Sequence, residues 1–393
     1  MLVSKRSWVE NSISWAVKVT IFTIIISLFL QNFLFSRDFG LLVFREIDDI
    51  AFQSTIRKAH LHIINGDFIN LLTINDYAYG LIYWLFVSLV TFPFFILSEY
   101  FEIHWPLIVF PRQLSLFFAI MSAVVIKKIA TNFGASNRYS NSLVLVFFLF
   151  PLTGYYSMRF GTVNFILLFS SLAVFFASKS AKLTVYHVLM SIISLSIATA
   201  IKLTGILIAP FVLYLLVSRI DTQFVKDNSK IALICIGLIP LFFVLMAAPQ
   251  LFVVIFNFGM YENYLARFLD FIASTQSSPI KTSAVEMLYT GIIGSHGIAI
   301  FVCFSMFGIA IAIWNRYENW LDYFFIFISV GVATLFLGVT SNSSVAISSY
   351  ITNVFFLLVF ALIPLKHIPA FSTFPLIAVC ILFLDAINTN VKA

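Results

Sequence analysis

Charged residues are scarce in this chain, and their scarcity excludes most soluble classes of protein. Only 10% of the 393 residues are Asp, Glu, Lys or Arg, whereas 61% are hydrophobic, and the mean hydropathy is +1.03. A soluble globular domain typically carries about 25% charged residues. The composition therefore predicts an all-α polytopic membrane protein, in which apolar runs of about 20 residues form spanning helices.

Residue patterns that hold metals, cofactors or nucleic acids are also lacking. The three cysteines, Cys235, Cys303 and Cys380, each lie in an apolar run and are expected to act as small hydrophobic residues. His60 and His62 stand two apart, so they do not face one way on a helix. There is no GxGxxG or GxxxxGK, and the aromatic residues are not interleaved with many cations. We expect no metal, no cofactor and no nucleic-acid partner.

Twelve apolar runs follow one another without a linker or a soluble domain, so residues 1–393 are expected to form a single membrane domain. The basic start is not followed by a small-residue cleavage site, which favours a retained first helix over a signal peptide. The runs are 18–36, 79–98, 107–127, 141–158, 162–178, 185–201, 203–218, 231–256, 290–313, 322–340, 350–365 and 370–388.

Basic loops between these runs set the expected topology, because Lys and Arg favour the cytoplasmic side. All of them fall on the side of the N-terminus if run 79–98, which contains Pro93, does not cross the bilayer. That run is then a re-entrant or interfacial helix, about eleven crossings remain, and segments 37–106 and 257–290 lie outside the cytoplasm. The basic residues in question are Lys127, Lys128, Arg138, Lys179, Lys182, Arg219, Lys226, Lys230, Arg316 and Lys366.

An acidic pair opens a predicted amphipathic helix over 46–64 in the first outer segment, "FREIDDIAFQSTIRKAHLHI". Asp48 and Asp49 stand one turn before an apolar stripe that is expected to face the membrane and consists of Phe52, Ile56, Ala59 and Ile63. One interpretation is that the two carboxylates complement the helix dipole. The other is that one of them is a general base held at the bilayer surface, with its partner orienting the substrate.

Three cations stand in outer corners between apolar runs, where the positive-inside rule gives them no anchoring role. Lys202 could snorkel at a hairpin, and Arg112 and Arg159 could be structural, but together they could bind a phosphate. The second outer segment, 257–290, contains a predicted amphipathic helix with Arg267. That helix either lies on the membrane or covers a lipid-linked substrate, with Arg267 near its phosphate.

The order of these motifs resembles the GT-C superfamily of integral-membrane glycosyltransferases. The motifs are "EIDDIAF", "GDF", "YAYGLIYWLF", "FPRQLSLFFAIMSAVVIKKI", "YYSMRFGTVNFILLFSSLAVFFASK" and "AIKLTGILIAP". Members include protein O-mannosyltransferases, lipid A aminoarabinose transferases and O-antigen glucosyltransferases. The resemblance covers residues 15–220, which would form the catalytic module with outer segment 37–106. Residues 221–393 share only the general plan of an outer loop, 257–290, followed by variable C-terminal helices.

The resemblance implies a GT-C-like fold and a sugar donor carried on polyprenyl phosphate. It also implies that the acidic pair holds the catalytic carboxylate, for which we favour Asp48 over Asp49. Where the family has "YGP" or "HPP", this chain has Tyr79-Gly80-Leu81 without the proline. Tyr77, Tyr79 and Asn164 are the implied substrate-binding residues.

This chain departs from the family at one outer corner, and the departure bears on the metal. The family often carries a carboxylate there, whereas this chain has Arg159, Gly161 and Asn164. A divalent metal is therefore not favoured. The implied donor-phosphate ligands are Arg159, Lys202, Arg112 and Arg267.

The expected activity is transfer of one sugar, with inversion, to an acceptor hydroxyl on the outer face of a bacterial inner (plasma) membrane. The N-terminus would be cytoplasmic, and the acceptor would be a cell-surface glycan such as O-antigen, a lipid or a protein. Two alternatives stay open. One is a polymerase or ligase of lipid-linked oligosaccharides. The other is a flippase or transporter, although no inverted repeat is evident.

Overall fold

The structure is a computed structural model that describes residues 2–37, 47–72, 81–103, 105–179, 183–219, 296–317, 319–340 and 356–367. Within these ranges the chain forms α-helices and short 3₁₀ helices and no strand. The expectation of an all-α protein is confirmed for this part of the chain. Run 231–256, run 370–388, outer segment 257–290 and Arg267 lie outside it.

Where the structure describes them, the predicted apolar runs coincide with helices. The long helices are α1 (Leu2–Arg37), α3 (Ile47–Ile64), α5 (Leu81–Phe101), α6 (Trp105–Asn132), α9 (Val163–Ala177), α10 (Val185–Ile201), α17 (His296–Trp314) and α18 (Trp320–Thr340). The shorter elements are α4 (Phe68–Leu72), α7 (Asn137–Leu149), α8 (Pro151–Ser157), η1 (Leu203–Ile208), α11 (Ala209–Arg219) and η3 (Ile363–His367).

Two predicted runs are interrupted, and the interruptions have local causes. Run 141–158 forms two helices, α7 and α8, because Phe150 precedes Pro151 and adopts an extended conformation with φ −62° and ψ 118°. Run 203–218 begins as the 3₁₀ helix η1 before α11 starts, and Lys202 separates it from α10 in an extended conformation. Helix α1 begins far before the predicted residue 18.

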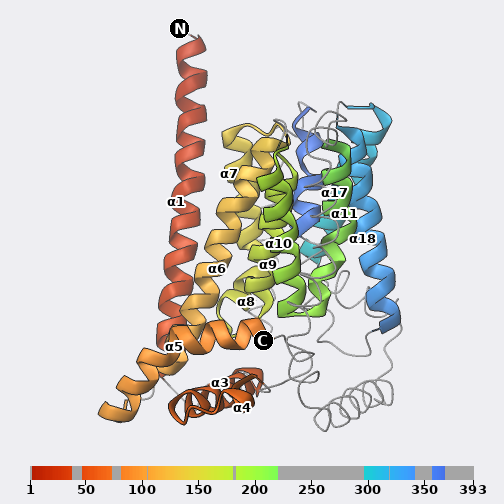
Figure 1. Cartoon of the computed structure of the whole chain (residues 1–393). Coiled ribbons are helices and arrows are strands. Elements are labelled where there is room, and N and C mark those ends of the chain that lie inside the picture. The colour runs from red at the N-terminus through yellow and green to blue at the C-terminus, as the bar shows by residue number, and fades with distance from the viewer. Residues whose placement is uncertain are drawn as a thin grey trace.

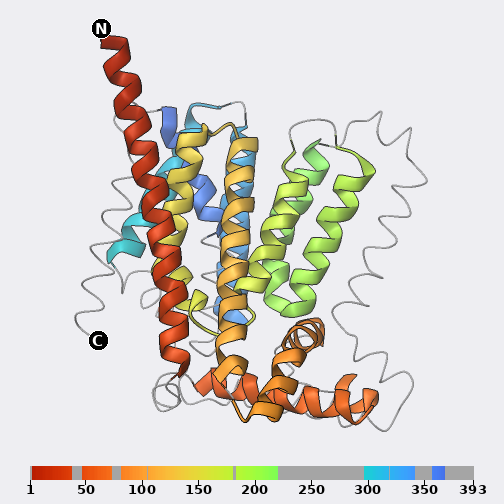
Figure 2. The ribbon, with the colours of Figure 1, turned by 90° about the vertical axis from the view of Figure 1, so that its left-hand side faces the viewer.

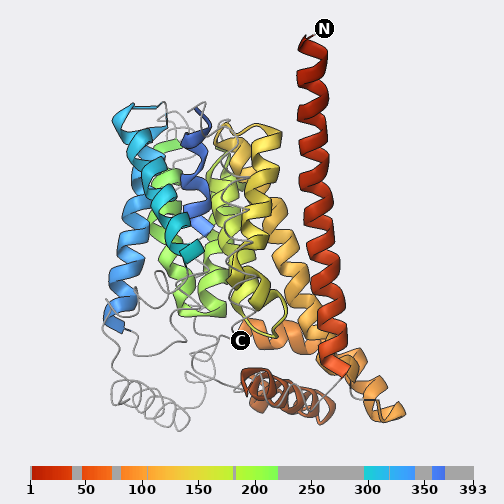
Figure 3. The same cartoon turned by 180° about the vertical axis from the view of Figure 1, so that it is seen from behind.

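Most helices form a bundle, and one end of that bundle is covered by helices of another orientation (Figure 1). Helix α1 stands at one edge of the bundle and α18 at the opposite edge, as the front and back views agree (Figures 1 and 3). Helix α5 lies across the end at which α1 finishes and α6 begins, and α3 and α4 lie beyond it (Figure 2). The described helices of the first outer segment therefore form a separate layer at this end.

Three helices in the described part are long and apolar enough to cross a membrane: Ser14–Leu34, Ile82–Phe101 and Trp105–Asn132. Six shorter apolar helices accompany them. The count of eleven crossings stays a prediction. By length and composition α5 could be a span, whereas its place across the bundle end favours the interfacial interpretation of run 79–98.

The basic loops described in the structure gather at the end of the bundle opposite α5. The α6–α7 and α17–α18 connections and the last turn of α11 lie there (Figures 1 and 3). Two side-chain hydrogen bonds connect elements at this end. Arg219 Nη1 donates to Ala177 O over 3.2 Å, and Lys366 Nζ donates to Gly134 O. This grouping supports a cytoplasmic assignment for that end, which stays a prediction.

Candidate functional site

The acidic pair lies in the first turn of α3, and α3 packs against α5. Ile56 and Ala59 are buried, with 5% and 1% of their surface exposed. Ile63 packs against the cluster of Ala59 and Leu71. The expectation that this stripe faces the membrane is therefore wrong for these residues, because the stripe contacts protein. An apolar stripe specifies an apolar partner, and lipid and a neighbouring helix both meet that condition.

His60 makes a buried polar contact between α3 and α5. Its Nε2 lies 3.0 Å from Ser88 O and 3.0 Å from Thr91 Oγ1, and the residue is fully buried. The ring also lies against Phe95, with centroids 4.7 Å apart. Since a carbonyl can only accept, Nε2 carries the hydrogen. Burial lowers the pKa of His60 because the charged form loses its hydration.

Helix α5 in turn packs against the corner between α8 and α9. Tyr83 stacks on Phe160 with centroids 6.1 Å apart, and Phe86 stacks on Phe165 at 5.2 Å. Phe165 also lies against Phe118 of α6, with ring centroids 4.5 Å apart. The aromatic rows thus join the layer that carries the acidic pair to the bundle segment that contains Arg159 and Asn164.

Buried amides and a hydroxyl fix that corner. Asn32 of α1, with 0% of its surface exposed, donates from Nδ2 to Ser157 O over 3.0 Å and to Arg112 O over 3.4 Å. Ser115 Oγ donates to Tyr156 O over 3.1 Å. Ser157 O and Tyr156 O, which lie at the end of α8, accept here from side chains of α1 and α6.

Asn164 completes this network from α9. Its Nδ2 donates to Ser115 O over 3.2 Å and to Ser115 Oγ over 3.3 Å, and the residue is 1% exposed. The amide nitrogen of this implied substrate-binding residue is therefore committed to the protein interior. Helices α1, α6, α8 and α9 are joined through three polar side chains at the end that α5 covers.

Lys202 lies at the junction between α10 and η1, and a close backbone approach shapes that junction. Lys202 O accepts from the Gly205 N–H over 2.8 Å, and the Lys202 N–H donates to Ala198 O over 3.4 Å. A methyl group on Gly205 would overlap the Ala198 carbonyl and lie 2.8 Å from Thr199 N. Glycine is therefore required for η1 to fold back on α10.

The cations predicted to bind phosphate differ in accessibility. Arg159 follows α8, and like Lys202 it is half-buried. Arg112 lies inside α6 and only 3% of its surface is exposed, so its predicted place in an open corner is wrong. The α8–α9 corner and the α10–η1 junction lie at the same end of the bundle (Figure 1).

The remaining predicted site residues are described in part or not at all. Asp48 and Asp49 belong to α3, whereas their side chains lie outside the described atoms. Tyr77, Tyr79 and Arg267 lie outside the described residues. Within the described ranges no group of three or more His, Cys, Asp or Glu residues lies together, and the expectation of no metal stays a prediction.

Sequence reasoning missed Asn32, Ser115 and the structural role of His60. Asn32 interrupts the apolar run "LFLQNFLF", and a polar amide inside a spanning helix is a usable signal. His60 was weighed only as a metal ligand. Ser115 has no distinguishing signal, since serine occurs in many apolar helices of this chain.

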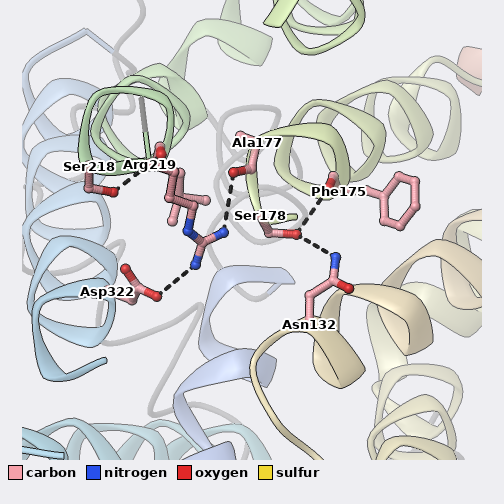
Figure 4. Close-up of polar contacts among 8 residues, drawn as sticks. Asn132, Phe175, Ala177, Ser178, Ser218, Arg219 and Asp322 are labelled. Carbon is pink, nitrogen blue, oxygen red and sulfur yellow. Dashed lines mark hydrogen bonds and ion pairs between the residues drawn. The ribbon is translucent and has the colours of Figure 1, made fainter. Parts of the chain in front are cut away.

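A partly buried ion pair lies at the other end of the bundle (Figure 4). Arg219 Nη2 lies 3.0 Å from Asp322 Oδ2, with 18% and 7% of the two side chains exposed. The guanidinium also lies over the Phe133 ring, 5.7 Å from its centroid. Arg219 is therefore more than the loop anchor expected from the positive-inside rule, because it joins α11 to α18. This pair connects helices and is distant from the layer that carries the acidic pair (Figure 1).

The fold defines a class, that of an α-helical protein whose apolar helices suit a lipid bilayer. No family model, no curated protein and no solved structure matches the chain. The further assignment therefore depends on the residues and contacts described above.

Proposed function

We propose that the protein is a membrane glycosyltransferase that moves one sugar from a polyprenyl-phosphate donor to an acceptor hydroxyl. The reaction takes place on the outer face of a bacterial inner membrane, and the acceptor is a cell-surface glycan, a lipid or a protein. The observation that carries the proposal is the sequence of contacts from α3 through α5 to the α8–α9 corner. This sequence joins the helix with Asp48 and Asp49 to the bundle end with Arg159 and Lys202.

The chemistry requires a base and a cationic site for the leaving group. Asp48 accepts the proton of the acceptor hydroxyl while the hydroxyl oxygen attacks the anomeric carbon. The bond from that carbon to the phosphate oxygen breaks, and its electron pair leaves with the polyprenyl phosphate. Arg159 and Lys202 stabilise the resulting charge. A single displacement inverts the anomeric centre, and the phosphate leaving group needs no strong acid.

Two groups contribute less directly. Arg112, which is buried, would act on the leaving group from the protein interior. Asn164 holds the corner beside Arg159 through Ser115. Arg267, Tyr77 and Tyr79 keep their proposed roles from the family resemblance.

The test measures release of polyprenyl phosphate by the purified protein in nanodiscs, with short-chain polyprenyl-phosphate glucose, mannose and related sugars as donors. Asp48→Asn should abolish release without loss of donor binding. Asp67→Asn is the matched control, because Asp67 lies in the same outer segment, is exposed, and bonds Asn70 at 2.6 Å. The Asp67→Asn substitution should leave the release of polyprenyl phosphate unchanged.

Equal turnover by Asp48→Asn and the unchanged protein would refute the assignment of the base. Lack of release from every donor by the folded protein would refute the single-sugar reaction. That result would favour the alternatives, a polymerase or ligase that uses a diphosphate carrier, or a flippase.

A further inference from the structure

His60 is the one described polar residue of α3 that is fully buried against α5. Its Nε2–H lies within hydrogen-bonding distance of Ser88 O and Thr91 Oγ1. Its Nδ1 is buried and has no hydrogen-bond partner among the described residues. The ring is flanked by Phe95 and by Phe92, the latter with centroids 5.8 Å apart. Only the neutral imidazole fits this environment, because a proton on Nδ1 would meet no acceptor.

No described carboxylate on or beside α5 and α4 pairs with His60: Glu102, which follows α5, is exposed, and the other two have partners of their own. On α5, Glu99 pairs with Arg57 of α3 over 3.7 Å. In the turn before α4, Asp67 lies 3.3 Å from His62 Nδ1. The remaining described cation on α3 is Lys58, which is exposed and would oppose a further positive charge. The ionisable groups on α3, α5 and the α4 turn therefore leave His60 neutral in the docked state.

His60 provides a buried polar contact that holds α3 against α5, beside the apolar contacts of Ile56 and Ala59. Among the described elements, α5 and the short helix α4 make the main contacts with α3. The other contacts to α5 are apolar or, like the Arg57–Glu99 pair, exposed, with 67% and 49% of the two side chains accessible. An exposed ion pair of this kind contributes little to docking.

We propose that His60 is a pH-sensitive latch, whose protonation releases α3 from α5 and so withdraws the acidic pair from the cationic corner. His60 is a positioning residue in this scheme and touches no substrate. The consequence for catalysis rests on the proposed function, whereas the release of α3 does not. The latch would restrict activity to neutral or alkaline surroundings outside the cytoplasm.

The direction of the pH effect follows from the lowered pKa of the buried imidazole. Exposed histidine takes up a proton near pH 6.5, and docked His60 does so only at lower pH. Between these two values the undocked state binds one more proton. The docking equilibrium is therefore constant above about pH 6.5, weakens by up to about tenfold per pH unit below it, and becomes constant again below the lowered pKa of docked His60.

The experiment follows the α3–α5 distance directly, without donor or acceptor. Spin labels are placed at Lys58→Cys on α3 and Leu89→Cys on α5, both at exposed positions, after replacement of Cys235, Cys303 and Cys380 by alanine. The full chain is reconstituted in nanodiscs, and pulsed electron spin resonance records the distance distribution from pH 8 to pH 4.5. We expect one narrow distance at pH 8 and a broader, longer distribution at low pH.

Two substitutions assign the transition. His60→Gln keeps a side-chain N–H for Ser88 O and cannot titrate, so it should stay docked at every pH. His62→Gln is the matched control, because His62 lies on the same helix, is half-buried and faces Asp67. It should keep the transition of the unchanged protein.

An unchanged distance in the wild-type protein over this range overturns the proposal. A transition that persists in His60→Gln, or one that disappears in His62→Gln, does the same. If His60→Gln is undocked already at pH 8, His60→Phe provides a second non-titrating side chain for the apolar pocket. If that variant is also undocked at pH 8, the pH midpoint of the distance change is compared between the wild type and His62→Gln. Equal midpoints support the latch, and a shifted or absent transition in His62→Gln overturns it. The distances are independent of transfer, so a failed transfer assay would refute the proposed function and leave the latch intact.

Discussion

Replacement of Gly205 by alanine should damage both stability and transfer, because the junction beside Lys202 has no room for a methyl group. The added Cβ would overlap the carbonyl of Ala198 and lie 2.8 Å from Thr199 N. These atoms belong to the backbone of α10, so no side-chain rotation can relieve the contact. The φ of Gly205 lies outside the left-handed region, and the effect is therefore purely steric.

The magnitude follows from the size of this overlap. Because non-bonded carbon atoms pack about 3.5 Å apart, η1 must move by about 1 Å. Overpacking of this kind costs about 1–3 kcal/mol. A displacement of about 1 Å at a catalytic cation can lower the rate about a hundredfold. We therefore expect Gly205→Ala to lower Tm by several degrees and polyprenyl-phosphate release by about two orders of magnitude.

Gly161→Ala is the matched control, since an added Cβ there meets no atom within 4 Å. Gly161 also follows Arg159 in the other outer corner, so both variants add one methyl group beside a predicted phosphate ligand. Thermal unfolding in detergent and the release assay measure the two effects. Equal behaviour of Gly205→Ala and Gly161→Ala would refute the steric argument. Loss of stability in Gly205→Ala without loss of release would refute the role of Lys202.

Three further predictions concern the contacts that hold the bundle. Arg219→Met should cost about 3–5 kcal/mol of unfolding free energy, because it leaves the buried Asp322 carboxylate without its partner. Asp322→Leu should cost less, because Arg219 is only partly buried, and the double variant clearly less than the sum of the two; additive losses in chemical unfolding would contradict this. Gly308→Ala should cost about 1–3 kcal/mol, because its Cβ would overlap Ala361 O, and an unchanged Tm relative to Gly331→Ala, where space is open, would exclude it. Asn32→Leu should cost about 1–3 kcal/mol by leaving the buried Ser157 carbonyl, at the end of α8, without its side-chain donor, and full stability with full transfer would show that this carbonyl does not need the amide.

Much of the described fold could be predicted from hydropathy, because spanning helices must satisfy their own backbone and therefore appear as long apolar runs. Runs 107–127, 162–178 and 185–201 agree with α6, α9 and α10 within a few residues. Run 141–158 was predicted as one helix and forms two. The signal for the break, Pro151, was present in the sequence, and the restriction that proline places on Phe150 explains the result.

The candidate site was only partly accessible from the sequence. The acidic pair, Arg159 and Lys202 could be selected because charges in an apolar chain are conspicuous. The burial of Arg112 could not be foreseen, because its neighbours in space come from α1 and α8. The partner of Arg219 was equally hidden, since Asp322 is 103 positions away.

The sequence by itself determined the membrane class, the order of the helices, and the end of the bundle at which basic residues gather. Only the tertiary structure decided that the apolar stripe of α3 contacts α5, that His60 is buried there, and that Asn32 joins α1 to the α8 corner. The physical reason is that periodicity defines which side of a helix is apolar and leaves its partner open. Lipid and protein satisfy an apolar face about equally, and buried polar atoms select between them only when the helices are packed.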